Sequence, residues 1–492
     1  MGKGSLKRLG RRRFLAGAAT VALLSGVVSR AHAQARALPI PRLVDSAAGP
    51  IRLEAAGATH AFGVGWPSPT MGYSSTYLGP TLLFRNGRSA DIEIRNLLDE
   101  PTSTHFHGLL IPAAADGSPH HPVAPGTTWR TSFRVAQPAA TAWYHAHPHG
   151  ATGRQVYSGL AGLAIVEDLD ARRHGLPATY GIDDLPLILQ DRAFDPEGRL
   201  VYFNRGPAMM MGMRGATFVV NGVVEPVARV PAGLVRLRIL NAANARNFDL
   251  AFDDGRPFAA IATDGGYLRE PAQLRSLVVA PGERVEIVVD FSSGLGARLE
   301  TGSDTAAALA GRLPVSGRIM GRGSGPLLRF EVDRALPAQG RLPDRLRELA
   351  PVHVRPELVR RTVSLDMGAS MMRSPAEHGG AHASPFGING RPFDPSRIDF
   401  EPRLGGDEIW DIAPQMMSHP FHIHGAMFRI LEIDGQAPPA HLAGEKDTVL
   451  ATGPIKLLVS FRQPATAVHP FMFHCHVLEH EDAGMMGQYR TI

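Results

Sequence analysis

Cysteine is almost missing from this chain, since Cys475 is the only one among 492 residues. A single thiol excludes an internal disulfide, although an exported protein would allow one. If the protein is exported, its single cysteine needs an explanation, which can be metal ligation, an intermolecular disulfide or chemical reactivity. Its surroundings, HCHVLEHEDAGMM at 474–486, place a histidine on each side of the thiol and two methionines shortly after it.

Long hydrophobic runs are also scarce. One apolar stretch runs from Phe14 to about Val28, which is too short to anchor the chain across a bilayer. It follows RRR at 11–13 and precedes AHA at 31–33, and this order is typical of a secretory signal peptide. The RRxFL run resembles a twin-arginine signal, which exports folded proteins. Residues 1–33 are therefore predicted to direct export by the twin-arginine machinery to the periplasm, with no membrane anchor in the mature protein.

A strong charge of one sign is lacking once that signal is removed. The formal net charge of the whole chain is +5, but seven Lys and Arg residues and no acid fall within residues 1–33. The mature chain thus carries a formal charge of −2, and the basic character belongs to the signal. This balance argues against a nucleic-acid partner.

Helical periodicity is rare in the rest of the chain, whereas strand-like runs bounded by Gly, Pro, Asn and Asp are frequent. The clearest runs lie at 89–98, 128–136, 160–168, 234–242, 276–291 and 456–463. Short strands at this density predict an all-β chain of Greek-key β-sandwiches or barrels in tandem.

Two phrases echo each other, RNGRSADIEIRNLL at 85–98 and VPAGLVRLRILNAAN at 230–244, and LGGDEIWDIAP at 404–414 is a looser third. Their spacing fits three similar domains. A Pro-, Arg- and Leu-rich stretch before the last one has the composition of a connector. The predicted organisation is a signal at 1–33, domains at 40–170, 171–340 and 361–492, and a connector at 341–360.

Histidine is concentrated in four short motifs, each with an HxH pair. The motifs THFHG, WYHAHPHG, SHPFHIHG and HCHVLEH supply His105, His107, His145, His147, His419, His422, His424, His474, His476 and His480. Residues i and i+2 of a strand point to the same face, so each pair projects two imidazoles side by side. An isolated HxH is most often an ordinary surface or core feature, but four together predict a metal cluster. Imidazole suits copper, zinc, iron and nickel alike.

The HCH segment narrows the choice of metal. If His474 and His476 face one way, then Cys475 faces the other way, toward a second site. Two histidines, one cysteine and a weak axial methionine form the blue-copper electron-transfer set. His480, Met485 and the unpaired His419 are available for it.

With these motifs, the chain resembles three-domain multicopper oxidases, most of all the bacterial periplasmic cuprous oxidases and laccase-like enzymes. The likeness also covers WYHAHPHGATGRQVYSGLAGLAIVED, LVRLRILNAANAR and IATDGGYLREPAQLRSLVVAPGER. It implies three cupredoxin-like sandwiches, with a trinuclear copper cluster between the first and the third. The middle domain offers no HxH pair of its own.

The resemblance implies four copper ions. The type 1 ion would be held by His419, Cys475, His480 and Met485, and the type 2 ion by His105 and His422. The two type 3 ions would share His107, His145, His147, His424, His474 and His476. Electrons from a donor would pass from the type 1 site through Cys475 to the cluster, where O2 becomes water.

Two carboxylates are candidates for delivering protons to the cluster. By the resemblance, Asp116 matches an acid on the type 2 side, and Glu481 matches an acid beside the type 3 pair. The alternative for each is an ordinary solvated loop carboxylate. Asp482 is interpreted as structural.

The electron donor stays open between phenols or other aromatic reductants and Cu(I). Soft thioethers select Cu(I), but methionine also fills cores. AMMMGMRG at 208–215 fits either role, and DMGASMMRSPAEHGGAH at 366–382 is interpreted as a flap over the type 1 site. The cuprous oxidases carry an acid where this chain has Gln415. The favoured function is a laccase-like monomeric oxidase with metallo-oxidase activity.

Three alternatives remain. The first is a dedicated cuprous oxidase for copper tolerance. The second is a copper-binding or sequestering protein without turnover, or a non-catalytic relative, although such a protein should have lost several ligands. A two-domain nitrite-reductase-like arrangement fits poorly, because the chain is long and its type 1 ligands lie at the extreme C-terminus.

Overall fold

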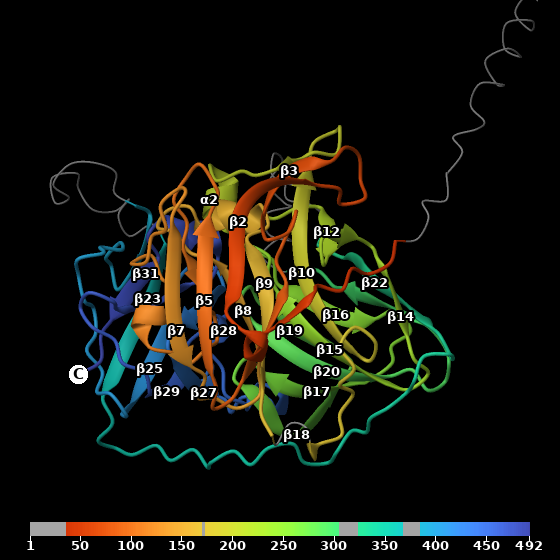
Figure 1. Cartoon of the computed structure of the whole chain (residues 1–492). Helices are drawn as coiled ribbons and strands as arrows, with labels where there is room; N and C mark the ends of the chain where they lie inside the picture. Colours follow the sequence, from red (N-terminus) through yellow and green to blue (C-terminus); the bar gives the residue numbers. More distant parts are fainter. Residues whose placement is uncertain (1–35, 170–172, 305–322, 368–383) are drawn as a thin grey trace, which may run out of the picture. The chain divides into compact units, whose positions relative to one another are not determined.

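The computed structural model describes residues 36–169, 173–304, 323–367 and 384–492 (Figure 1). Residues 37–492 form one compact unit that is built almost entirely of β-strands. The predicted signal at 1–33 lies outside the described residues. Among the described residues, no helix is long and apolar enough to cross a membrane.

Two sheets formed by the first third of the chain enclose one hydrophobic core. In spatial order, one sheet contains β1 (Leu43–Asp45), β4 (Thr81–Arg85), β9 (Ala161–Glu167), β8 (Ala140–Ala146) and β6 (Thr104–His105). The other contains β3 (Ser68–Tyr73), β2 (Ile51–His60), β5 (Ser89–Asn96) and β7 (Thr128–Arg134). Strand β5 alternates exposed and buried residues, as expected for a strand with one face on the core.

The middle third forms a second, larger pair of sheets around its own core. One sheet runs β13 (Val223–Val224), β12 (Thr217–Val220), β10 (Asp184–Phe194), β15 (Leu234–Asn241), β20 (Arg284–Asp290), β17 (Phe258–Thr263) and β18 (Gly266–Leu274), with β11 (Leu200–Val201) paired to β10. The other runs β14 (Val227–Val230), β22 (Gly325–Val332), β21 (Ala297–Thr301), β16 (Phe248–Phe252) and β19 (Ser276–Val279).

The last third supplies the third pair of sheets, whose core includes Cys475 and Met485. One sheet runs β24 (Phe386–Ile388), β23 (Arg360–Met367), β25 (Asp407–Pro414), β29 (Ile455–Phe461) and β27 (Ala426–Ile433). The other runs β28 (Thr448–Ala451), β26 (His419–Ile423), β30 (Phe471–Cys475) and β31 (Met486–Tyr489). The prediction of an all-β fold with sandwiches in tandem is confirmed.

The three echoing phrases become equivalent strands. Each of β5, β15 and β25 pairs in parallel with an earlier strand and antiparallel with a later one, namely β2 and β7, β10 and β20, and β23 and β29. The asparagine that ends the first two strands has the same task in both. Asn96 accepts a hydrogen bond from Leu98 N, and Asn241 accepts one from Ala243 N, while both amides donate to backbone carbonyls. The echo therefore reflects a repeated structural unit.

The connections between the sheet pairs lie near the predicted boundaries. Strand β9 ends at Glu167 and β10 begins at Asp184, while residues 333–359 contain no helix or strand and appear as the long teal stretch in Figure 1. The boundaries themselves stay a prediction, because residues 37–492 form one compact unit.

Helices are few and short in the described residues. They are α1 (Thr152–Tyr157), α2 (Pro207–Met211) and α4 (Leu478–Asp482), with 3-10 turns at Ser46–Ala48, Ala113–Ala115 and Ala440–Leu442. Helix α4 contacts both α1 and α2, so short helices from all three thirds of the chain meet at one place.

Candidate metal centres

The register of the sheets places each HxH motif beside one other HxH motif. Strands β6 and β8 pair His105 with His145, and strands β26 and β30 pair His422 with His474. The second histidine of each motif lies just beyond the end of its strand. Within each motif the two ring centroids are 5.0–5.6 Å apart, so neighbouring rings reach the same space.

Rings from the first third of the chain meet rings from the last third. His105 stacks on His424 with centroids 3.7 Å apart, and His107 stacks on His422 at 3.6 Å. The Nε2 atom of His474 lies 3.2 Å from Nε2 of His424 and 3.4 Å from Nε2 of His147. All eight histidines of the HxH motifs are buried. They form one cluster, called the histidine cluster below.

Hydrogen bonds to one ring nitrogen orient most of these imidazoles. The Nδ1 atoms of four rings each lie 2.9–3.0 Å from a backbone carbonyl oxygen, and these rings belong to His105, His145, His422 and His474. A neutral imidazole that donates from Nδ1 keeps its lone pair on Nε2. In three of them Nε2 is buried without a hydrogen-bond partner: His105, His145 and His422. Such orphaned nitrogens fit a metal as their partner.

Burial also affects the protonation of seven rings of the cluster. Desolvation lowers the pKa of His107, His145, His147, His422, His424, His474 and His476. These rings are therefore neutral at neutral pH, which is the form that binds a metal.

The thiol forms a separate centre on the other face of strand β30. Cys475 Sγ lies 3.3 Å from His419 Nδ1 and 3.7 Å from His480 Nδ1. The Nε2 atoms of these rings lie 3.1 Å from carbonyl oxygens, those of Gln415 and Met210 respectively. Both rings thus point Nδ1 at the sulfur, so two imidazoles and a thiol converge.

The surroundings of the sulfur suit a bound cation. Burial raises the pKa of the Cys475 thiol, so without a metal it stays protonated, whereas a coordinating metal deprotonates a thiol outright. Val477 N donates a hydrogen bond to Sγ at 3.3 Å. Met485 is fully buried in the same core as Cys475, and its carbonyl oxygen accepts from Cys475 N at 3.1 Å.

The two centres share one short piece of chain. Cys475 points to His419 and His480, while its neighbours His474 and His476 belong to the histidine cluster. The geometry expected from the alternation of a strand is therefore present. Whether each histidine serves a type 2 or a type 3 ion stays a prediction, as does the ligand role of Met485.

Both predicted carboxylates touch cluster histidines. Asp116 Oδ2 lies 2.7 Å from His424 Nδ1, and Asp116 Oδ1 lies 3.3 Å from His105 Nδ1. Glu481 lies 3.4 Å from His147 Nδ1 and 3.2 Å from His474 Nδ1. Both side chains are buried, and burial raises the pKa of Glu481 well above its usual value. Asp482 instead accepts from the backbone N–H groups of Thr152 and Gly153 at the start of α1.

The middle third contributes groups that were not anticipated from the sequence. Arg284, at the start of β20, forms a buried ion pair with Asp447, and Asp447 Oδ1 lies 3.1 Å from His107 Nε2. Helix α2 lies against the thiol centre through Met210 O and His480. The PGER sequence around Arg284 was part of the family likeness, but nothing in its local pattern shows which carboxylate it meets.

The methionine-rich segment at 208–215 packs against protein. Met213 is buried, while Met209 and Met210 are half-buried against the core that holds Cys475. Of the second segment, Met367 is a buried core residue, but residues 368–382 with Met371, Met372, His378 and His382 lie outside the described residues. Gln415 donates to Asp366 Oδ1 at 2.7 Å, so a carboxylate lies beside the position where the cuprous oxidases carry an acid.

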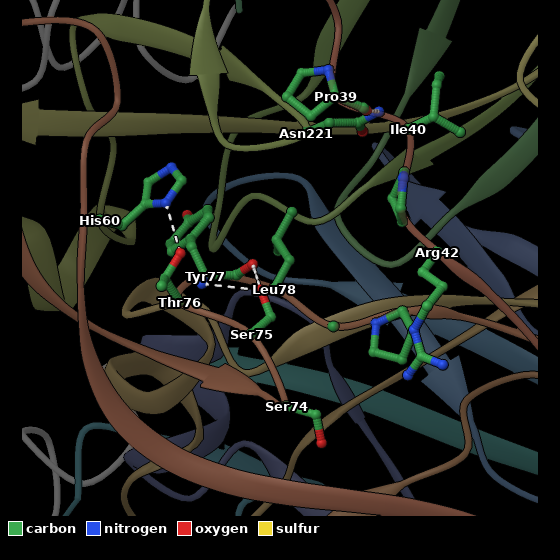
Figure 2. A pocket seen from close by; sticks show the side chains of 13 residues that line it. Pro39, Ile40, Arg42, His60, Ser74, Ser75, Thr76, Tyr77, Leu78 and Asn221 are labelled. Atoms are coloured by element: carbon green, nitrogen blue, oxygen red, sulfur yellow. Dashed lines mark hydrogen bonds between the residues drawn. The ribbon is translucent and has the colours of Figure 1, made fainter.

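A cavity of about 260 Å³ away from both centres is shown in Figure 2. His60 stacks on Tyr77 there, and both its ring nitrogens have partners, Thr76 Oγ1 at 3.1 Å and Gly222 O at 2.8 Å. None of the predicted ligands lines this cavity.

The donor set of the thiol centre narrows the choice of metal. Neutral imidazoles alone suit several transition metals, but a thiolate with two imidazoles in a buried pocket suits copper. The residues therefore fit copper at both centres.

Comparisons with known proteins agree with this chemistry. Three models described as multicopper oxidase match residues 57–171, 203–296 and 362–492. The multicopper oxidase mco of Staphylococcus epidermidis is 35% identical over 86% of this chain and 84% of that protein. The cell division protein FtsP of Edwardsiella tarda is 37% identical over 98% of both chains.

A solved structure extends the likeness. The laccase-like multi-copper oxidase CueO of Ochrobactrum sp., described as having oxidase activity towards lignin model compounds and lignosulfonate, is 43% identical. It covers 92% of this chain and 100% of its own length with a TM-score of 0.82. The sandwiches are thus cupredoxin-like, and the chain belongs to the multicopper oxidase family.

Proposed function

We propose that this protein is a laccase-like oxidase that takes single electrons from phenolic or other aromatic donors, and from Cu(I), and reduces O2 to water. One observation carries the proposal. The Cys475 thiol faces His419 and His480, while the residues on either side of it belong to the histidine cluster. A site that accepts electrons is thus joined to a second centre through a few covalent bonds.

Four copper ions, one at the thiol centre and three at the histidine cluster, would supply one-electron transfer and four-electron reduction of O2. The protein holds both sets of ligands in advance, because hydrogen bonds to backbone carbonyls orient the rings. A pre-oriented, buried donor set favours metal binding without reorganisation.

Reduction of one O2 to two waters consumes four electrons and four protons, and phenols release a proton for each electron they lose. Within the protein, Asp116 and Glu481 are placed to deliver protons, since each lies between two cluster histidines. Both carboxylates are buried beside the cluster, and they are the proposed proton relay.

Two features support a mixed donor range. The Ochrobactrum relative is described as acting on lignin model compounds, which are aromatic. Near the thiol centre, Met209 and Met210 pack against its core, and Met416 is 80% exposed three residues before His419. Thioethers bind Cu(I), so these methionines support Cu(I) as an electron donor in addition to aromatic compounds.

The test is oxygen uptake by the copper-loaded mature protein with a phenol and with Cu(I), in wild type and Cys475→Ser. Serine oxygen is a poor copper ligand, so the variant should lose its blue colour and nearly all uptake while retaining cluster copper. His353→Gln removes an exposed histidine outside both centres and serves as the control. A colourless wild type whose thiol is freely alkylated would overturn the proposal.

A dedicated cuprous oxidase is the nearest alternative, and one further variant separates it. Removing residues 368–382 deletes the methionine- and histidine-rich stretch but leaves Met367, which is a buried core residue. Loss of the Cu(I) rate alone would indicate a cuprous oxidase. Equal retention of both rates would show that the stretch serves neither donor.

A role in cell division is the second candidate function, and one observation favours it, the likeness to cell division proteins over 98% of the chain. A non-catalytic role would not require ligands, yet both centres here have all their histidines and the thiol. A protein that binds copper and consumes no O2 with any donor would support that role, or copper sequestration.

Export to the periplasm by the twin-arginine route is part of the proposal and rests on residues 1–33. Replacing Arg11, Arg12 and Arg13 with lysine should leave the protein in the cytoplasm, detectable by cell fractionation. Export of that variant at the normal rate would contradict the proposed twin-arginine route.

A further inference from the structure

One histidine of the cluster is turned the opposite way from four of its neighbours. His105, His145, His422 and His474 engage Nδ1 with backbone carbonyls, but His107 engages Nε2, which lies 3.1 Å from Asp447 Oδ1 and 3.1 Å from Thr448 Oγ1. Its Nδ1 is buried and has no hydrogen-bond partner. His107 therefore has only Nδ1 to offer to a metal.

The orientation of His107 depends on Asp447, and Asp447 depends on the middle third of the chain. Arg284 Nη1 donates to Asp447 Oδ1 at 2.7 Å, and Nη2 donates to Oδ2 at 2.5 Å. This two-pronged geometry fixes the plane of the carboxylate. Both oxygens are engaged by the guanidinium, and Oδ1 also faces His107 Nε2, so the fixed carboxylate orients this ring.

Arg284 is in turn held by several groups. Its Nε donates to Thr141 O on β8 at 3.1 Å, and its backbone N–H donates to Asp264 Oδ1 at 2.7 Å. Lys446 bridges Asp264 and Glu283 at 2.8 and 3.1 Å. Every side chain of this network is buried. A buried charge network is costly to form, and it persists only when its members are mutually satisfied.

The backbone around the cluster makes room for this pair. Gly108 directly follows His107, and a Cβ there would lie 2.3 Å from Arg284 Nη2 and 3.0 Å from Asp447 Oδ2. Its φ of +86° also disfavours other residues. On the same turn as Arg284, a Cβ at Gly282 would lie 2.8 Å from His476 Cδ2. The middle third is thus packed directly onto the histidine cluster.

We propose that Arg284 and Asp447 form a positioning pair that holds His107 with Nδ1 toward the cluster, making the middle third of the chain a working part of the oxygen-reducing centre. This inference rests on the proposed function. The thiol centre has no contact with the pair, since its ligands bond to Gln415, Met210 and Val477 instead.

The test compares copper retention in Asp447→Asn and wild type during dialysis against a graded chelator. Asparagine keeps one acceptor oxygen and replaces Oδ2 with an NH2 group that cannot accept a hydrogen bond, so the contact from Arg284 Nη2 is lost. The side chain that faces His107 Nε2 is then no longer fixed in its plane by the two-pronged pair. Loss of such an outer partner should weaken copper binding by the cluster roughly 10–100-fold. The blue absorption of the thiol centre should be unchanged, while the near-ultraviolet absorption and electron paramagnetic resonance of the cluster copper should change.

Glu283→Gln is the matched control, because it alters the same buried network through Lys446 without touching Asp447. If Asp447→Asn fails to fold, Arg284→Lys gives the same answer, since lysine cannot make both carboxylate contacts. Full cluster copper and an unaltered cluster spectrum in the variant that folds would overturn the positioning role. A wild type without copper or oxygen uptake would instead overturn the proposed function.

Discussion

At the scale of single residues, the chemistry of both centres depends on which ring nitrogen each histidine leaves free. In the cluster, backbone carbonyl oxygens are hydrogen-bond partners of Nδ1 of His105 and His145. Beside the thiol, they are instead partners of Nε2 of His419 and His480. The same side chain thereby presents a different atom in each centre. Asp116 and Glu481, which contact the cluster rings, add groups that can accept protons beside these nitrogens.

The first prediction concerns Asp116. Asparagine keeps an oxygen that can accept from His424 Nδ1 but cannot carry a proton, so Asp116→Asn should slow reoxidation by O2 by about 100-fold. The blue absorption should be unaffected, because Asp116 does not touch the thiol centre. Stopped-flow mixing of the reduced protein with O2 measures the rate.

The control is Asp99→Asn, the same change at an exposed carboxylate. Turnover by Asp116→Asn at the wild-type rate would remove Asp116 from the proton relay.

At the scale of elements, short helices rather than strands complete the thiol centre. Helix α4 carries His480, and α2 from the middle third supplies the carbonyl that orients it. Glu479 joins them, accepting from Met213 N at 2.9 Å and from Tyr202 OH at 2.9 Å. The position of α2 should therefore affect the spectrum of the thiol centre.

The second prediction tests that link at the end of α2. A Cβ on Gly212 would lie 2.3 Å from Ala245 Cβ and 2.6 Å from Val477 Cγ1, so Gly212→Ala must displace α2 or Val477. We expect a loss of about 1–3 kcal/mol from overpacking, in addition to the cost of the positive φ. The blue absorption should shift as well, because Val477 N donates to Cys475 Sγ.

Gly206→Ala is the control for backbone strain, since Gly206 also has a positive φ but nothing within 4 Å of its added Cβ. Denaturant unfolding and visible spectra of both variants give the comparison. Equal spectra in the two variants would contradict the proposed link.

At the scale of the whole molecule, hydrogen bonds of Thr141 join the first third of the chain to a buried ion-pair network in the middle third. Glu286 on β20 accepts from Thr141 on β8 at 2.7 Å and from Arg236 and Arg238 at 2.8 and 3.0 Å. Burial alone would raise the pKa of Glu286, but the two arginines outweigh it and lower the pKa to about 2. This junction joins β20 to β8, the strand that carries His145 of the histidine cluster.

The third prediction is a pH dependence of stability. A carboxylate with a lowered pKa stabilises the fold fully above its unfolded pKa of 4.5, and this contribution disappears as pH falls toward 2. At neutral pH it amounts to about 3 kcal/mol, from the difference in pKa. Glu286→Gln should therefore be clearly less stable than wild type at pH 7, and the gap should close between pH 4.5 and 2.

Denaturant midpoints measured across that range check the prediction. Glu93→Gln is the control, because Glu93 forms only surface pairs, with Arg52 and Arg130, and should contribute little. A gap that does not depend on pH would show that Glu286 acts through packing alone.

Much of the molecule could be predicted from local patterns. The alternation of residues 89–96 indicated a strand with one buried face, and the spacing of HCH placed Cys475 opposite His474 and His476, because side chains alternate along a strand. The three similar phrases that begin at residues 85, 230 and 404 indicated three related units through their spacing. These features depend on neighbours within a few residues.

What the sequence alone determined was therefore the class of fold, the motifs that carry the candidate ligands and their division into two groups. Tertiary structure decided which strands are neighbours, which ring nitrogen faces inward, and that Arg284 reaches Asp447 from 163 residues away. Such contacts join distant parts of the chain, and their formation depends on the packing of whole sheets. No local periodicity encodes them, so the role of the middle third became visible only in the folded molecule.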